Sequence, residues 1–222
     1  MRTHRTRTRI LIADDHELIR QGLRKMLEDQ PGFTICGEAM TGLEAVNKAR
    51  ELRPDVVVLD VGMPELNGLE AARRIRREVP GAEVLILTMH DSAQLARAAL
   101  AVGASGFLLK TDMGRTVLSA LEHLRQRKPF FTSKVAGLVQ DSGLRPSTSR
   151  IAEVQDASRP TPREREVVQL LAEGKSNKEI AAALGISVHT AETHRSNVMR
   201  KLGLRSMSEM VRYAIRERII EP

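Results

Sequence analysis

The feature that most constrains the fold is a regular alternation of two kinds of segment between residues 9 and 126. Short β-forming runs are each followed by a stretch in which apolar residues recur at helical spacing. Strands that alternate with helices in this way lie parallel, because each helix carries the chain back across the sheet. The pattern therefore predicts a doubly wound, five-stranded parallel α/β sheet, with strands at residues 9–14, 33–39, 55–60, 83–88 and 106–109.

The pattern changes after residue 126. Ser, Thr, Arg, Gly and Pro dominate residues 127–159, which predicts a linker with one short helix near residues 135–139. From Thr161 onward the chain reads as four helical segments, and glycines stand between them as they do just past helix ends. We therefore expect a first domain at residues 1–126, a linker at 127–158 and a small all-α domain at 159–222.

Composition narrows the possible partners and the compartment. The formal net charge of +7 favours an anionic partner such as DNA, whereas an aromatic content of 2% argues against stacking of bases on exposed rings. No apolar run approaches the roughly 20 residues that span a bilayer, and the basic start of the chain lacks the long apolar stretch of a signal peptide. The single cysteine, Cys36, suits a reducing compartment. We therefore expect a cytoplasmic protein without a membrane segment.

A distinctive set of polar residues stands where four of the predicted strands end. Asp14 and Asp15 follow the first strand, and Asp60 ends the third. Ligands gather at the carboxyl ends of parallel strands, so these carboxylates are expected to lie together. They would repel one another unless a cation joined them, and oxygen ligands suit Mg²⁺. Thr88 and Lys110, at the ends of the fourth and fifth strands, could bind phosphoryl oxygens.

This set predicts a carboxylate that accepts a phosphoryl group. Each residue taken alone could have a purely structural role instead, since an Asp after a strand often caps the next helix and a lone Lys usually lies in solvent. Two other possible ligand sites, a nucleotide-binding P-loop and a zinc site, are excluded. The glycines of residues 37–42 have Walker-like spacing, but no Lys and hydroxyl residue follow them. His189 and His194 are five residues apart, which does not place both on the helix face that a zinc pair requires.

The same residues, taken with their neighbours, resemble the signature of response-regulator receiver domains, which have a CheY-like fold of the flavodoxin type. The resemblance covers about half of the chain. It rests on IADDH at residues 12–16, LDVGMP at 59–64 with Gly68, LT at 87–88 and GASGFLLK at 103–110.

The resemblance implies a role for each residue of the set. Asp60 would be phosphorylated by a partner histidine kinase, and Phe107 would change its orientation on activation. From the residues alone, Phe107 reads equally well as a plain core side chain. Mg²⁺ would be held by Asp60 together with Asp14, Asp15 and the backbone carbonyl of Gly62, and the phosphoryl group by Thr88 and Lys110.

The second half of the chain contains a helical hairpin. Residues 179–187 read as a helix, a turn at Gly185 and a new helix capped by Ser187. In that second helix Ala191 and Val198 lie on an apolar face, and the opposite face is polar and basic, as in a recognition helix that enters the major groove. A generic helical bundle with a solvated face is the alternative, because helical hairpins are common.

This half is similar to the LuxR-type helix-turn-helix, on TPREREV at residues 161–167, SNKEIA at 176–181, IS at 186–187 and KLG at 201–203. With the receiver in front, the whole chain resembles the NarL/FixJ subfamily of response regulators. The resemblance implies DNA and a histidine kinase as partners, and a homodimer when active or on DNA. The residues expected at the DNA are Asn177, Lys178, Ser187, His189, Thr190, Glu192, Thr193, Arg195, Ser196, Arg200 and Lys201.

Two positions depart from the residues that are frequent in the LuxR-type family. Ala191 stands in place of Val and is expected to pack less tightly. Glu192 stands in place of Lys; it can accept a hydrogen bond from cytosine N4 but repels phosphate. The operator preference of relatives therefore does not transfer to this chain.

Two rival functions remain. A DNA-binding regulator with a vestigial receiver conflicts with the intact acidic set. An aspartate-based phosphatase would need a second Asp two residues after Asp60 as its general acid, and Gly62 stands there. The sequence therefore predicts a transcription regulator, not an enzyme, whose DNA binding is controlled by phosphorylation of Asp60.

Overall fold

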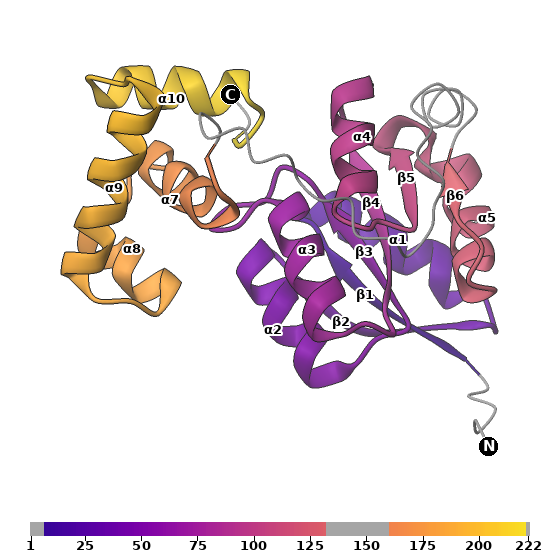
Figure 1. Cartoon of the computed structure of the whole chain (residues 1–222). Helices are drawn as coiled ribbons and strands as arrows, with labels where there is room; N and C mark the ends of the chain where they lie inside the picture. The colour runs from indigo at the N-terminus through magenta and orange to yellow at the C-terminus, as the bar shows by residue number, and fades with distance from the viewer. Residues whose placement is uncertain (1–6, 132–159, 221–222) are drawn as a thin grey trace.

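The computed structural model describes residues 7–131 and 160–220, which form an α/β domain and a helical domain (Figure 1). In the first domain all strands run parallel, in the order β2-β1-β3-β4-β5-β6. The predicted doubly wound α/β class is therefore confirmed. The strands are β1 (Thr8–Ala13), β2 (Phe33–Ala39), β3 (Val56–Asp60), β4 (Glu83–Thr88), β5 (Gly106–Leu109) and β6 (Phe130–Phe131).

The sixth strand corrects the prediction of a five-stranded sheet. In β6, Phe130 and Phe131 pair in parallel with Gly106 and Phe107. The ring of Phe130 also lies edge-on to that of His123, with 5.3 Å between the ring centroids. The first domain thus extends into the segment predicted as a linker, because two aromatic residues complete an otherwise open edge. The short helix expected near residues 135–139 and the first six residues lie outside the described part of the chain.

The helices of this domain form two layers. Helices α1 (Glu17–Glu28) and α5 (Met113–Arg125) cover one face of the sheet. The other face is covered by α2 (Gly42–Leu52), α3 (Gly68–Glu78) and α4 (Ala93–Ala101). Successive side chains of a strand point to opposite faces, so Ile10 of β1 packs toward α1 and α5, whereas Leu11 packs toward the other layer.

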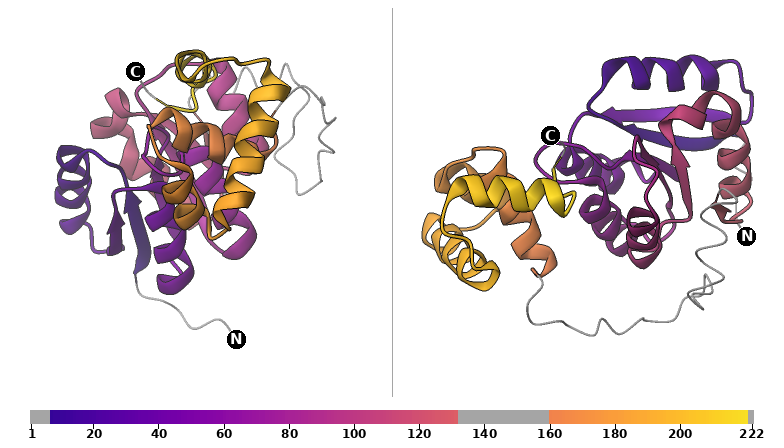
Figure 2. Two further views of the ribbon diagram at one scale, coloured as in Figure 1. Left: turned by 90° about the vertical axis from the view of Figure 1, so that its left-hand side faces the viewer. Right: turned by 90° about the horizontal axis from the view of Figure 1, so that it is seen from above.

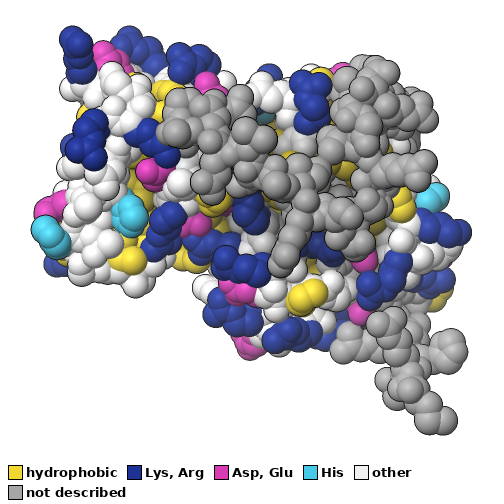
Figure 3. All heavy atoms as spheres, viewed as in Figure 1, with side chains coloured by type: hydrophobic (Ala, Val, Ile, Leu, Met, Phe, Trp, Pro, Cys, Tyr) yellow, Lys and Arg dark blue, Asp and Glu magenta, His cyan; other side chains and the backbone are white. Residues whose placement is uncertain are grey.

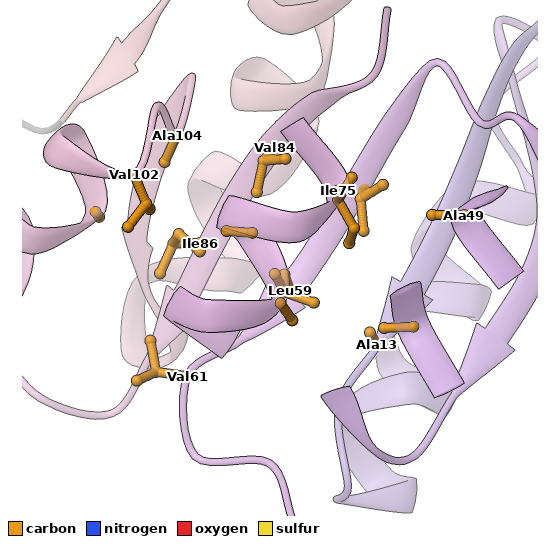
Figure 4. Packing of buried hydrophobic residues seen from close by; sticks show 14 of the residues in the cluster. Ala13, Ala49, Leu59, Val61, Ile75, Val84, Ile86, Val102 and Ala104 are labelled. Carbon is orange, nitrogen blue, oxygen red and sulfur yellow. The ribbon is translucent and has the colours of Figure 1, made fainter. Parts of the chain in front are cut away.

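The layer over α2, α3 and α4 is built from small and branched side chains. Figure 4 shows Leu59 and Val84 of the central strands beside Ile75 of α3, and Ile86 on the side of Val102. All five residues of β3 are buried, as expected for a strand covered on both faces. This packing fixes the end of β3, where Asp60 stands, and it supports the acidic site described below.

The helical domain contains α7 (Pro162–Ala172), α8 (Asn177–Leu184), α9 (Val188–Leu202) and α10 (Met207–Arg216). Each helix begins after a Thr or Ser whose side chain accepts a hydrogen bond from a backbone N–H of the first turn, and Ser187 caps α9 as predicted. Gly185 and Gly203 end α8 and α9 with positive φ angles of 64° and 65°. The predicted helix–turn–helix boundaries are therefore confirmed. No helix in the described residues is long and apolar enough to cross a membrane.

The helical domain lies against the α3 and α4 side of the first domain. The right-hand view of Figure 2 shows α7 and the end of α10 nearest to that side. Hydrogen bonds between the domains join α7 to the loop between β3 and α3, as in the bond from the backbone N–H of Asn67 to the side chain of Gln169. The loop that follows Asp60 is therefore also a contact between domains.

Candidate functional site: an acidic pocket and a helix-turn-helix surface

An acidic pocket lies at the carboxyl edge of the sheet. Asp14 follows β1 and Asp60 ends β3, and these residues are 1% and 2% exposed. Lys110, which follows β5, places its Nζ 2.8 Å from Asp14 Oδ2 and 3.0 Å from Asp60 Oδ2. The topology thus brings together residues that are nearly one hundred positions apart in the sequence, with one ammonium between two buried carboxylates.

Asp15 lies at the exposed mouth of this pocket, and His16 lies beside it. The His16 Nδ1 is 2.7 Å from Asp15 Oδ1, and the His16 backbone N–H donates to Asp14 Oδ1 at 2.9 Å. One ligand atom from each of Asp14, Asp15, His16 and Asp60 lies within 4.8 Å of the others. Three carboxylates at this spacing offer the hard oxygen ligands that suit a divalent cation such as Mg²⁺. His16 is the one member that was absent from the predicted set.

The opposite charges in the pocket stabilise one another. Burial lowers the pKa of Lys110, but the carboxylates of Asp60 and Asp14 raise it by more, so the pKa lies above the ordinary value of 10.5. The ammonium therefore stays charged across the neutral range. On the other side of Asp60, its Oδ1 accepts a hydrogen bond from the Val61 N–H at 2.8 Å. Both oxygens of the Asp60 carboxylate are thus engaged and point in fixed directions.

Two further predicted residues lie on β4 and β5. Thr88 ends β4, is fully buried, and accepts a hydrogen bond from the His90 N–H at 3.1 Å through its Oγ1. Phe107 is 2% exposed and packs in the core under α2, α3 and α4. In this conformation Phe107 is a core side chain, which is the plainer of its two interpretations.

One residue that supports the pocket was missed by the sequence analysis. Arg20 of α1 is buried, and its Nη1 donates to the backbone carbonyl of Asp14 at 2.8 Å. Its Nε also lies 3.4 Å from Glu38 Oε2. The signal was available, because Arg20 stands three and seven residues before Leu23 and Leu27 and so shares their buried helix face. A charged residue at such a position needs a partner, and here it orients the loop that carries the acidic pair.

Replacing Lys110 by Met should destabilise the first domain strongly. The change leaves Asp14 and Asp60 buried without their cation, and loss of one partner from a buried charge pair costs about 3–5 kcal/mol. The loss should be smaller with millimolar Mg²⁺, because an added cation restores the balance of charge. Urea unfolding followed by far-ultraviolet circular dichroism, with and without Mg²⁺, measures both effects. The exposed Lys128→Met is the control and should unfold like the wild type. Equal stability of both variants would contradict a structural role for Lys110.

The candidate DNA surface lies on α8 and α9. Ala191 and Val198 are fully buried in the core of the helical domain, which leaves the opposite face of α9 in solvent. Asn177, Thr190, Arg195 and Lys201 are half-buried. The predicted DNA residues that are exposed are Lys178, Ser187, His189, Glu192, Thr193, Ser196 and Arg200.

Some of these side chains already have partners within the domain. Lys201 Nζ is paired with Glu164 Oε2 at 2.8 Å. Arg195 extends toward Met207, and the hydroxyl of Ser187 caps α9 through the Thr190 N–H. Figure 3 shows Lys and Arg side chains over both domains, so charge alone does not mark the DNA surface. Lys178 and Arg200 are the exposed cations of the predicted set.

Comparison with known proteins agrees with this architecture. Residues 10–122 match the response regulator receiver domain, and residues 161–214 match the luxR family of bacterial regulatory proteins. The transcriptional regulatory protein MctR of Rhizobium johnstonii is 36% identical over 98% of both chains. The transcriptional regulatory protein LiaR of Bacillus subtilis is 36% identical over 96% of this chain and 99% of its own.

Solved structures give the same result. A structure of the RcsB response regulator of Salmonella typhimurium is similar with a TM-score of 0.62 and 27% identity, over 94% of this chain and 96% of that chain. An RcsB–DNA complex is similar with a TM-score of 0.56, over 93% of this chain and 97% of that chain. With 36% identity to regulators over almost its whole length, and matches in both halves, the chain belongs to the two-component response regulators that join a receiver domain to a LuxR-type DNA-binding domain, a family of transcription regulators rather than enzymes.

Proposed function

We propose that Asp60 is the phosphoacceptor of this regulator and that a partner histidine kinase controls its DNA binding by phosphorylating it. The observation that carries this proposal is the buried Asp60 carboxylate at the end of β3, with Lys110 Nζ 3.0 Å from one oxygen and Asp14 beside the same ammonium. A carboxylate held in one direction, with a cation to offset incoming phosphate charge, is suited to attack phosphorus.

The other pocket residues divide the remaining tasks. Asp14, Asp15, Asp60 and the backbone carbonyl of Gly62 would hold Mg²⁺, which when bound offsets the repulsion between carboxylates and phosphate. Thr88 and Lys110 would donate hydrogen bonds to phosphoryl oxygens. Phe107 would transmit the change by turning its ring. The fit of Mg²⁺ rests on the three converging carboxylates, since oxygen ligands of this kind are those it prefers.

The outward face of α9, together with the start of α8, would enter the major groove. His189, Glu192 and Thr193, which are exposed polar residues at the start of α9, would meet base edges. Lys178 and Arg200 would contact phosphates. Two copies bound symmetrically would require half-sites about one helical turn apart. A cytoplasmic location follows from the proposal, because the partner is DNA.

A phosphate mimic tests this proposal against a vestigial receiver. DNA fragments should first be selected from a random library with the full chain in the presence of beryllofluoride and Mg²⁺. The selected fragment should then bind at least about tenfold more tightly with beryllofluoride than without it, a coupling within the usual range for two linked sites. Omitting Mg²⁺ should remove the gain. Equal affinity under all three conditions would contradict phosphorylation control and support the vestigial alternative.

DNA binding should weaken as the salt concentration rises, because each cationic contact releases a counterion from a DNA phosphate. Removing such a contact should make the affinity less dependent on salt. Lys178→Gln and Arg200→Gln should each lower the slope of log affinity against log salt by about one, because each removes one phosphate contact. Fluorescence anisotropy with a labelled duplex between low and moderate salt measures the slope. Lys128→Gln, on the first domain, serves as control and should leave it unchanged. Unaltered slopes in both α8 and α9 variants would place the DNA surface elsewhere.

A further inference from the structure

The helical domain contacts the first domain at the loop that follows Asp60. One side chain spans this loop, which covers residues 61–67. The Gln169 Nε2, in α7, donates to the backbone carbonyl of Met63 at 2.9 Å, and the Gln169 Oε1 accepts from the backbone N–H of Asn67 at 2.6 Å. Gln169 is only 1% exposed. Both polar ends of a buried side chain are therefore used to bind the backbone of another domain.

Two contacts that involve charged side chains lie near this pair of hydrogen bonds. The Glu65 N–H donates to the carboxylate of Glu173, which lies one helical turn after Gln169 and also accepts from its Nε2 at 2.8 Å. The Arg74 guanidinium of α3 donates to Glu166 Oε1 at 3.1 Å. Side chains of α7 and its C-cap Glu173 thus contact the first domain at Met63, Glu65, Asn67 and Arg74.

The contact leaves the candidate DNA surface uncovered. Among the described residues, no hydrogen bond or ion pair joins α9 to the first domain, and Figures 1 and 2 place α9 on the far side of the helical domain. The docked helices therefore do not block DNA sterically through α9. What α7 holds directly is the loop next to the phosphoacceptor.

We propose that Gln169 is a positioning residue through which the helical domain restrains phosphorylation of Asp60, an inference that rests on the proposed function. In phosphorylation by acetyl phosphate, one carboxylate oxygen of Asp60 bonds to phosphorus. The bond from phosphorus to the bridging oxygen breaks, and acetate leaves with that electron pair. The Asp60 oxygen that forms the new bond no longer receives its present donor, either the Val61 N–H or the Lys110 ammonium.

The restraint follows from where the loop is tied. If Val61 moves with the phosphorylated carboxylate, residues 61–67 have to adjust, but Gln169 fixes Met63 and Asn67 in their present positions. Docking by Gln169 and phosphorylation of Asp60 therefore favour different positions of one loop. By linkage, docking disfavours phosphorylation to the same extent that phosphorylation disfavours docking. A residue of the DNA-binding domain thereby sets how readily the receiver is modified.

The test compares labelling rates of full-length variants with acetyl phosphate and Mg²⁺. Gln169→Leu has neither polar group and should be labelled at least about fivefold faster than wild type, the lower end of usual coupling between sites. Gln169→Glu keeps the acceptor for Asn67 but sets a carboxylate against the Met63 carbonyl, so it should also be faster. Hydrogen exchange of the backbone N–H of Asn67 should accelerate in Gln169→Leu, which has no acceptor for it. Glu164→Gln is the matched control, because the Glu164 side chain accepts from the Thr161 N–H and pairs with Lys201 within the helical domain. Its rate should equal that of wild type.

The outcomes separate this inference from the proposed function. Labelled wild type with equal or slower labelling of the two Gln169 variants would overturn the restraint, as would faster labelling of Gln169→Leu without faster exchange at Asn67. Absence of labelling in wild type would instead contradict the assignment of Asp60. Unchanged circular dichroism and unchanged binding to non-specific DNA establish that each variant is folded, and two different substitutions guard against a defect in either one.

Discussion

Asp60→Asn should abolish transfer of a phosphoryl group from acetyl phosphate. Labelling is expected to fall at least about a hundredfold, because a neutral amide is no nucleophile toward phosphorus. The substitution preserves the size of the side chain and its acceptor for the Val61 N–H, so the loss concerns chemistry rather than folding. The measurement is incorporation of radiolabelled phosphate in the presence of Mg²⁺, with and without a chelator.

The matched control for this prediction is Asp29→Asn. Asp29 is exposed at the end of α1, which lies at the opposite edge of the sheet from the acidic pocket. Its variant should be labelled like the wild type. Labelling of Asp60→Asn at the wild-type rate would show that another residue accepts the phosphoryl group. Labelling of wild type that survives removal of Mg²⁺ would contradict the role of the ion.

The core of the first domain could be predicted from periodicity because its causes are local. In β3 the run from Val56 to Leu59 has no polar residue, and in α1 the apolar residues return at helical spacing. Strands 33–39, 83–88 and 106–109 have the predicted boundaries. β6 could not be predicted in this way, because two residues show no period and their only signal is the β5 edge that they complete.

The acidic pocket could be predicted because topology places strand ends together whatever the side chains. Thr88 and Lys110 needed only the order of the strands to be placed near Asp60. The partners of surface cations depend instead on how the helices pack against one another. Lys201 was expected at the DNA, but it pairs with Glu164, 37 residues earlier, and such a contact depends on how α7 packs on α9. No spacing along the sequence reveals it.

The contact between domains was missed for a related reason. Six consecutive residues of α7, from Glu166 to Leu171, are buried. Periodicity assigns Val167, Leu170 and Leu171 to the helical core, but it assigns Glu166 and Gln169 to solvent. These two residues are buried because they contact the first domain. The periodicity of one helix does not reveal which other domain packs against it. A Gln and a Glu on one side of an otherwise apolar helix are the only hint.

Gly68→Ala should destabilise the first domain by about 3 kcal/mol or more, at the upper end of overpacking effects. Gly68 is the first residue of α3, and its N–H donates to the carbonyl of Val61 at 2.9 Å. A Cβ there would lie 1.9 Å from the backbone oxygen of Asp60, 2.8 Å from its carbonyl carbon and 2.9 Å from the Val61 Cα. All three are backbone atoms at the end of the buried strand β3, so none can move aside cheaply.

The clash in Gly68→Ala should also slow the phosphorylation of Asp60. To remove the clash, the Asp60 carbonyl or the start of α3 must move, and either movement shifts the Asp60 carboxylate relative to Lys110. Any Gly68→Ala protein that folds should therefore be labelled by acetyl phosphate more slowly than wild type. Gly114→Ala is the matched control, since no atom lies within 4 Å of its added Cβ and it is the second residue of α5. There alanine should be neutral or slightly stabilising, because it loses less backbone entropy than glycine on folding. Urea unfolding of both variants decides the matter, and equal stabilities would mean that β3 and α3 can separate freely, which would remove the basis for a rigidly held Asp60.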